Sequence, residues 1–134
     1  MDLATARRRV QHAPVGHLAT VRPDGRPHVV VCCFALVGDV AYTAVDAKPK
    51  STLALQRVTN LGAQPAASLM VDHYEDDWSQ LWWVRLDGTA RIIESATASE
   101  EAHTSLQAKY AQYAEVAIPG PVIALDIHSW RMWP

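Results

Sequence analysis

Gly16 to Ala44 reads GHLATVRPDGRPHVVVCCFALVGDVAYTA, and two turn signals divide it into three β-rich runs. Pro23–Asp24–Gly25 and Gly38–Asp39 are the turns, since these residue types favour tight reversals of the chain. The three runs cover residues 16–21, 27–36 and 40–44. They predict three strands of an antiparallel meander. The middle run is continuously apolar, which predicts a strand buried on both faces.

The rest of the chain adds three more strands and three short helices by the same criteria. The strands are expected at residues 66–74, 81–93 and 122–132, and the helices at 1–13, from 51 to about 57–60, and 97–113. Asp2 is a good N-cap, Thr97 and Glu100 form a capping box, and Gly88 marks a bend or bulge within its strand. The pattern predicts one mainly β (α+β) domain over residues 1–134, a small antiparallel barrel of about six strands with flanking helices.

Composition excludes several classes of protein. The chain has 134 residues, of which 49% are hydrophobic and 19% charged, and this predicts a single globular domain. A net charge of −2 argues against broad nucleic-acid binding. The adjacent Cys32 and Cys33 would point to opposite faces of a strand, which argues against a disulfide and suits a reducing cytosol. The apolar run Val29–Val37 is too short for a membrane span, and no apolar segment of a signal peptide follows Arg7–Arg9. We therefore expect a cytoplasmic protein with no membrane partner.

The segment Asp46–Thr52, DAKPKST, has the composition of an anion site. Lys48 and Lys50 flank a proline, whose fixed φ stiffens the backbone between the two cations. Ser51 or Thr52 can cap the following helix, whose first N–H groups and positive dipole end would face the same anion. A phosphate is the natural ligand of such a site. The alternative interpretation is a solvated turn before a surface helix.

Aromatic residues suggest a flat ligand. Five tryptophans occur in the chain, at positions 78, 82, 83, 130 and 133. Trp82 and Trp83 are adjacent, so in a strand they face opposite sides, and one of them needs a second layer, a partner subunit or a flat ligand. The alternative is that both are core residues. Together with the phosphate site, this pattern indicates a flat aromatic cofactor with an anionic tail. The sequence has no Gly-rich nucleotide motif, no nucleophile elbow and no His spacing typical of a metal site.

Several motifs resemble one known family. The hairpin 16–28 resembles the opening of pyridoxamine 5′-phosphate oxidase-like split β-barrel proteins. Further motifs are similar to an actinobacterial branch of probable F420-dependent enzymes among the flavin/deazaflavin oxidoreductases: DAKPK (46–50), VDHYEDDW (71–78), LWWVRLDG (81–88), KYAQY (109–113) and PVIALD (121–126). The resemblance implies a split-barrel homodimer with two cofactor sites between the subunits. The cofactor would be the deazaflavin F420 or, as in relatives, FMN.

The resemblance also assigns site residues by position. Lys48 and Lys50 match the basic pair that holds the cofactor phosphate, with Ser51 and Thr52 beside them, Arg57 as a further cation, Val30, Val31 and Cys32 on the strand under the ring, and Trp78 as an aromatic near the cofactor tail. Many relatives have proline where this chain has Val30–Cys33. Arg7–Arg9, Arg22 and Arg26 are candidate contacts for a polyglutamate tail.

The leading hypothesis is a reductase that passes hydride from F420 to a small unsaturated or carbonyl-like substrate. The alternatives are an FMN-dependent oxidoreductase of the same fold and a non-catalytic protein that binds a cofactor or haem. His28 and Tyr42 are candidate proton donors because they lie near the expected cleft; the catalytic residue is not assigned.

Overall fold

A computed structural model of the chain describes residues 1–45, 52–94, 99–115, 118 and 121–134. Its elements are α1 (Leu3–His12), β1 (Gly16–Val21), β2 (Pro27–Cys32), β3 (Ala35–Val37), β4 (Val40–Ala44), α2 (Thr52–Ala63), β5 (Ala66–His73), η1 (Trp78–Gln80), β6 (Trp82–Ile93), α3 (Glu100–Lys109), α4 (Gln112–Glu115) and β7 (Val122–Trp133).

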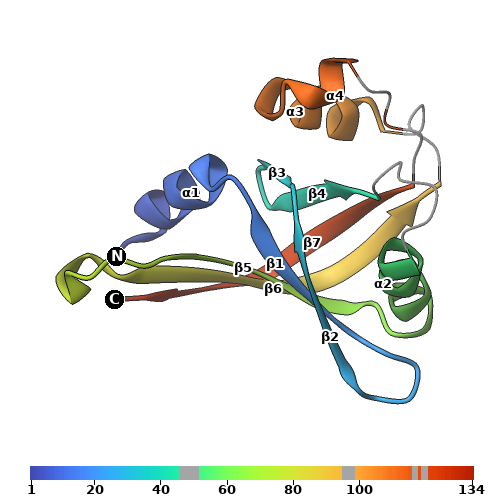
Figure 1. Cartoon of the computed structure of the whole chain (residues 1–134), viewed down its shortest axis with the longest axis horizontal. Helices are drawn as coiled ribbons and strands as arrows, with labels where there is room; N and C mark the ends of the chain where they lie inside the picture. Colours follow the sequence, from blue (N-terminus) through green and yellow to red (C-terminus); the bar gives the residue numbers. More distant parts are fainter. Residues whose placement is uncertain (46–51, 95–98, 116–117, 119–120) are drawn as a thin grey trace.

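One antiparallel sheet carries the strands in the order β2-β1-β5-β6-β7-β4-β3. β2 and β3 are its opposite edges, although Cys33 and Phe34 are all that separates them in the chain. The sheet must therefore curl until its two edges approach each other, and Figure 1 shows the resulting half-barrel. The predicted split antiparallel barrel is confirmed, with seven strands in the described chain in place of about six.

The seventh strand arises because the predicted strand over residues 27–36 breaks at Phe34. The Phe34 N–H donates to the Tyr110 hydroxyl at 3.0 Å, and the Phe34 carbonyl lies 3.0 Å from the same hydroxyl. The Thr43 hydroxyl donates to the Cys33 carbonyl at 2.7 Å. Side-chain hydroxyls thus make the hydrogen bonds of the backbone groups that have no partner in the sheet. Buried backbone N–H and C=O groups require such bonds. The predicted three-stranded meander was wrong, because its middle strand divides into β2, which pairs with β1, and β3, which pairs with β4 at the opposite edge of the sheet.

The prediction that this apolar run is buried on both faces was also wrong. In β2, His28 and Cys32 face the interior, whereas Val29 and Val31 are 64% and 61% exposed. β2 is an edge strand, and its outward side chains have no layer above them in the described chain.

The core fills the concave side of the sheet. Fully buried side chains from four strands meet there: Leu18, Leu69, Val71, Val84, Leu86, Ile123 and Leu125. Phe34 enters the same cluster from the break between β2 and β3, and α1 contributes Ala6 and Val10. Each buried Leu or Val contributes about 1.5–3 kcal/mol relative to exposure. A second cluster lies under α3, around Leu106.

The helix boundaries follow the sequence signals in part. Asp2 caps α1 as predicted, since its carboxylate accepts from the Thr5 N–H at 2.8 Å. α3 is capped by Ser99, whose hydroxyl accepts from the Ala102 N–H at 3.1 Å, whereas the predicted cap Thr97 lies outside the described residues.

α2 continues to Ala63, so the predicted end near residues 57–60 was wrong. Asn60 and Leu61 are buried beneath the helix, and these contacts outweigh the low helix propensity of Gly62. None of the described helices is long and apolar enough to cross a membrane.

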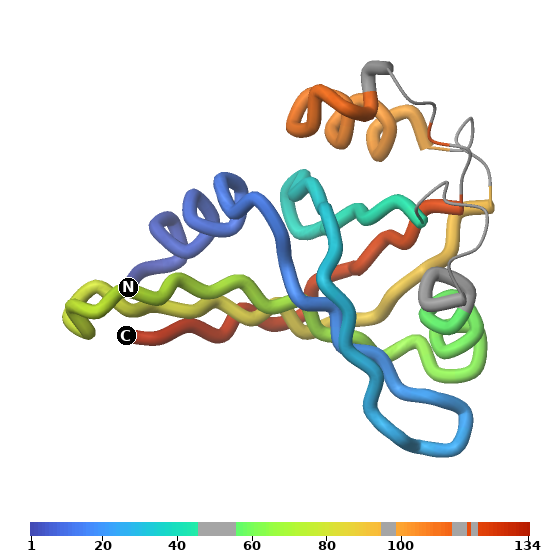
Figure 2. Tube along the Cα trace, in the orientation of Figure 1, coloured from blue at the N-terminus to red at the C-terminus, as the bar shows by residue number. Residues whose placement is uncertain are grey.

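The two ends of the chain lie side by side (Figure 2). The amino group of Met1 donates to the carbonyl oxygen of Pro134 at 2.6 Å. This contact places the start of α1 beside the end of β7, at the same end of the sheet as the connection between β5 and β6 (Figure 1).

Candidate cofactor site

The lysine segment joins β4 to α2. Lys48, Lys50 and Ser51 lie outside the described residues; Thr52 begins α2, and its side chain is not described. Arg57 is the predicted site residue on α2 whose side chain the structure describes, and it is 8% exposed. The described residues around Arg57 therefore define the candidate site.

A buried polar cluster lies where α2 packs on β1. Its members are Thr20, His28, Arg57 and Asn60, with exposed fractions of 3%, 6%, 8% and 0%. Thr20 and His28 are cross-strand partners on β1 and β2. The Asn60 amide donates to the Thr20 hydroxyl at 3.0 Å, and the Gln56 amide donates to the Asn60 oxygen at 2.7 Å. These bonds fix α2 over the strands.

Two atoms of this cluster lack partners. Arg57 Nε and His28 Nδ1 are buried without a hydrogen bond to any residue that the structure describes. Buried polar atoms are nearly always hydrogen-bonded, and an unpaired buried charge is costly. An anionic ligand group would satisfy both atoms, so the cluster fits a phosphate that reaches it from the lysine segment.

Electrostatics in the cluster favour an anion. Burial lowers the pKa of His28, and the positive charges of Arg22 and Arg57 lower it further, so the imidazole is held neutral. Arg22 has no ion-pair partner within the described part of the chain. Burial raises the pKa of the Cys32 thiol, which outweighs the opposing charge of Arg57. Cys32 is therefore a protonated core residue, not a nucleophile.

His28 should make the protein less stable in mild acid. Because its folded-state pKa lies below the ordinary 6.5, the unfolded chain binds a proton that the folded chain does not. The His28 contribution to stability is complete above pH 6.5. It is lost as the pH falls from 6.5 toward the lower pKa of the folded state. We expect the melting temperature of wild type to drop between pH 7.5 and 5.5, and that of His28→Gln to drop less. Parallel curves for the two proteins, followed by circular dichroism, would contradict the assignment.

β2 offers backbone groups to a ligand. Val30 and Cys32 point inward and Val31 outward, so their side chains do not form one surface. However, β2 is an edge strand, and in an antiparallel sheet an edge strand leaves the N–H and C=O groups of alternate residues without sheet partners. This geometry suits the predicted contact with a ring through the backbone.

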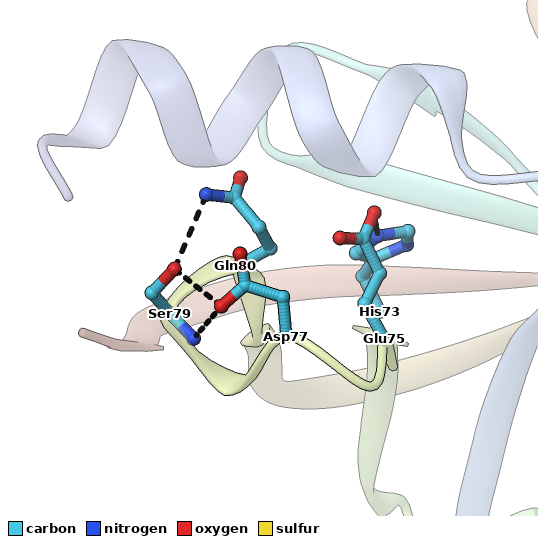
Figure 3. Close-up of polar contacts among 5 residues, drawn as sticks. All are labelled: His73, Glu75, Asp77, Ser79 and Gln80. Atoms are coloured by element: carbon cyan, nitrogen blue, oxygen red, sulfur yellow. Dashed lines mark hydrogen bonds and ion pairs between the residues drawn. The ribbon is translucent and has the colours of Figure 1, made fainter.

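Trp78 lies far from Arg57 within one chain. It belongs to η1, in the connection between β5 and β6, at the opposite end of the molecule from α2 (Figure 1), and it is 70% exposed. Asp77 holds this turn, since its carboxylate accepts from Ser79 N–H at 3.0 Å and Ser79 Oγ at 2.7 Å (Figure 3). One chain therefore does not bring Trp78 and Arg57 together.

Tyr42 is occupied by a structural contact. Its hydroxyl donates to Glu101, and burial, with this carboxylate, raises the pKa of Tyr42 to about 12. The phenol is 5% exposed under α3. A phenol in this state is a poor proton donor at neutral pH.

Sequence reasoning missed the hydrogen-bonded residues beside Arg57. Thr20, Gln56 and Asn60 carry no motif; Gln56 and Asn60 are one turn apart on α2, and Thr20 meets Asn60 only because α2 packs across β1. The sequence did contain a signal for the face of β2 on which His28 lies. Two-residue alternation puts it on the same face of β2 as Cys32, which the structure confirms.

The curled antiparallel sheet, its bulged β6 and the helix that covers β1 define a split β-barrel of the flavin-binding type. The family model of pyridoxamine 5′-phosphate oxidase matches residues 3–134, so the chain belongs to this family. No curated protein matches the sequence.

Three solved structures show how widely the fold is used. A conserved hypothetical protein from Mycobacterium tuberculosis has a TM-score of 0.78 at 22% identity, over 99% of this chain and 84% of that one. A haem storage protein from Vibrio cholerae has a TM-score of 0.71 at 18% identity, over 98% and 92%. An F420 reductase has a TM-score of 0.64 at 23% identity, over 90% and 91%. At these identities the likeness is one of fold.

Proposed function

We propose that the protein is an F420-dependent oxidoreductase that transfers hydride between the deazaflavin and a small unsaturated or carbonyl-like substrate. The observation that carries the proposal is the buried Nε of Arg57, which has no hydrogen bond to any described residue and lies beside His28, on the helix that follows Lys48 and Lys50 directly. Family membership and the shared fold with an F420 reductase support it.

In this proposal the phosphate end of the cofactor lies at the start of α2. Lys48 and Lys50 supply charge, Ser51 and Thr52 supply hydroxyls, and Arg57 binds from below the helix. The unsatisfied N–H groups of the first helical turn favour an anion at the same place. Charge-assisted hydrogen bonds are stronger than those between neutral groups and are worth about 1.5–3 kcal/mol each.

The ring end lies along the free edge of β2. F420 supplies the hydride when bound, so the chain's task is to orient a planar ring and exclude water from it. Backbone groups of Val30, Val31 and Cys32 are the contacts that the edge position makes available. The small, apolar side chains of this strand let a ring approach the backbone closely and keep the surroundings dry.

A homodimer completes the proposed site. Val29 and Val31 are mostly exposed on the outer face of the sheet. The strand register places Met70, Trp83 and the 47% exposed Trp133 on that same outer face. On this outer face the apolar side chains alternate with the charged Asp72, Arg85 and Arg131. Apolar groups ringed by charges are typical of a protein contact surface, and a second copy of the chain is the occupant that we propose. It would provide the second wall of the cofactor cleft and bring the remote Trp78 within reach of a cofactor.

FMN is the second candidate, and one observation favours it. F420 needs cations beyond its phosphate for the glutamate tail, whereas FMN ends at the phosphate. Of the arginines considered for this role, Arg7 pairs with Asp39 and Arg26 with Asp24. Arg8 and Arg9 lie on α1, so Arg22, near His28, is the arginine of this set that is left near α2 without an ion pair to a described residue.

Side-by-side titrations with F420, FMN and haemin test the proposal. We expect F420 to bind at least about tenfold more tightly than FMN, and Arg57→Gln to weaken both by about tenfold, the loss of one charge-assisted bond. Arg26→Gln removes the same charge from an exposed turn and should leave FMN binding unchanged.

Preference for FMN would transfer the chemistry to a flavin at the same site. Preference for haemin, or binding of none of the three ligands, would overturn the proposal. Light scattering on the same samples should give the mass of a dimer.

A further inference from the structure

We propose that a cavity between α1 and the β5–β6 hairpin binds a planar aromatic anion, a carboxylate or a phosphate. The cavity has a volume of about 470 Å³ and is lined by Arg8, Arg9 and His12 from α1 and by His73 and Trp82 from the hairpin. This volume lies within the usual range of small-molecule sites.

The aromatic wall is fixed in position. The rings of His73 and Trp82 are stacked, with centroids 5.9 Å apart and an interplanar angle of 16°. The Arg9 guanidinium lies over the same indole at 4.9 Å. His73 is held by Glu75 at 2.7 Å, and Figure 3 shows this pair beneath α1. Stacked planar groups with few free rotamers form a wall suited to a flat ligand.

The charge of the cavity is positive. Arg8 and Arg9 line it with two guanidinium groups, which outnumber the one carboxylate of the lining, Asp72. His12 Nδ1 lies 2.7 Å from the Arg8 carbonyl, to which it must donate. That bond orients the ring and leaves Nε2 for a ligand. Ala13 and Pro14 close the apolar side of the cavity.

The arginine run 7–9 is therefore divided between two roles. Arg7 turns away from the cavity, donates to the Gly38 carbonyl at 2.9 Å, pairs with Asp39 and lies over Trp130. Arg8 and Arg9 line the cavity, and neither has an ion-pair partner among the described residues. α1 and the β5–β6 hairpin, which line the cavity, lie at the end of the sheet opposite α2 (Figure 1), so the inference goes beyond the proposed cofactor site.

Calorimetric titration with indole-3-acetate and its neutral isostere indole-3-acetamide tests the inference. We expect the acetate to bind at least about tenfold more tightly, the contribution of one charge-assisted bond. Arg8→Gln should remove most of that preference and leave the acetamide affinity unchanged. Arg8 is exposed, and its side-chain bond within the described chain is to Thr5 in the same helix, so this variant should fold normally.

Two further variants separate this site from the cofactor site. Arg9→Gln, which also loses the contact with Trp82, should weaken both probes. The double variant Lys48→Ala/Lys50→Ala should bind indole-3-acetate as wild type does, whether or not it binds F420. Equal affinities for the two probes, no binding of either, an unchanged preference in Arg8→Gln, or loss of acetate binding in the lysine variant would each overturn the inference.

Discussion

The double variant Lys48→Ala/Lys50→Ala should raise the dissociation constant for F420 at least about 100-fold. In the proposed site each lysine would make a charge-assisted bond worth about 1.5–3 kcal/mol, and each 1.4 kcal/mol is about tenfold in affinity. We expect that Arg57 cannot replace them, because it is buried and supplies one cation where two are lost. Fluorescence titration measures the loss.

The charge-retaining variant Lys48→Arg/Lys50→Arg is the matched control. It should bind F420 within about tenfold of wild type, because both cations remain although their shape differs. Both double variants should melt at the wild-type temperature. Affinity retained in the alanine variant would remove Lys48 and Lys50 from the site and leave them as a solvated turn.

Gly88→Ala should destabilise the protein by about 3–5 kcal/mol, at the upper end of single substitutions. Gly88 is at the register shift of β6, opposite Ile127 of β7. A Cβ there would lie 2.0 Å from the backbone oxygen of Asp126. That oxygen cannot move aside cheaply, because Asp126 is held in the β4 and β6 ladders and bonded to Arg91 at 2.6 Å and 3.0 Å.

Urea unfolding followed by tryptophan fluorescence measures this loss. Gly62→Ala is the matched control, since it makes the same chemical change in α2 where no atom lies within 4 Å of the new Cβ. It should stabilise the helix by about 0.5–1 kcal/mol. Equal effects of the two substitutions would mean that the bulge can relax around a side chain.

Much of the candidate site could be anticipated from residue types. The lysine pair before a helix, Arg57 on that helix and the apolar strand over residues 29–32 are local patterns, and a family motif covers the lysine pair. The assembly of the polar cluster around Arg57 could not be anticipated. Thr20, His28 and Asn60 come from β1, β2 and α2, and their meeting depends on how the helix crosses the sheet. The cavity beside Trp82 likewise needs α1 to lie over a hairpin more than 60 residues away in the chain.

Sequence alone determined the elements whose signals are local: the Pro23–Gly25 hairpin, the Asp2 cap and the bulge at Gly88. A turn, a cap and a bulge each depend on a few neighbouring residues, so their chemistry is visible in the chain itself.

The tertiary structure decided where the apolar run over residues 27–36 divides and which of its faces is covered. The break at Phe34 exists because the Tyr110 hydroxyl, 76 residues away, satisfies the backbone that leaves the ladder. That long-range bond sends β2 and β3 to opposite edges of the sheet and leaves the β2 edge, where we place the cofactor ring, open.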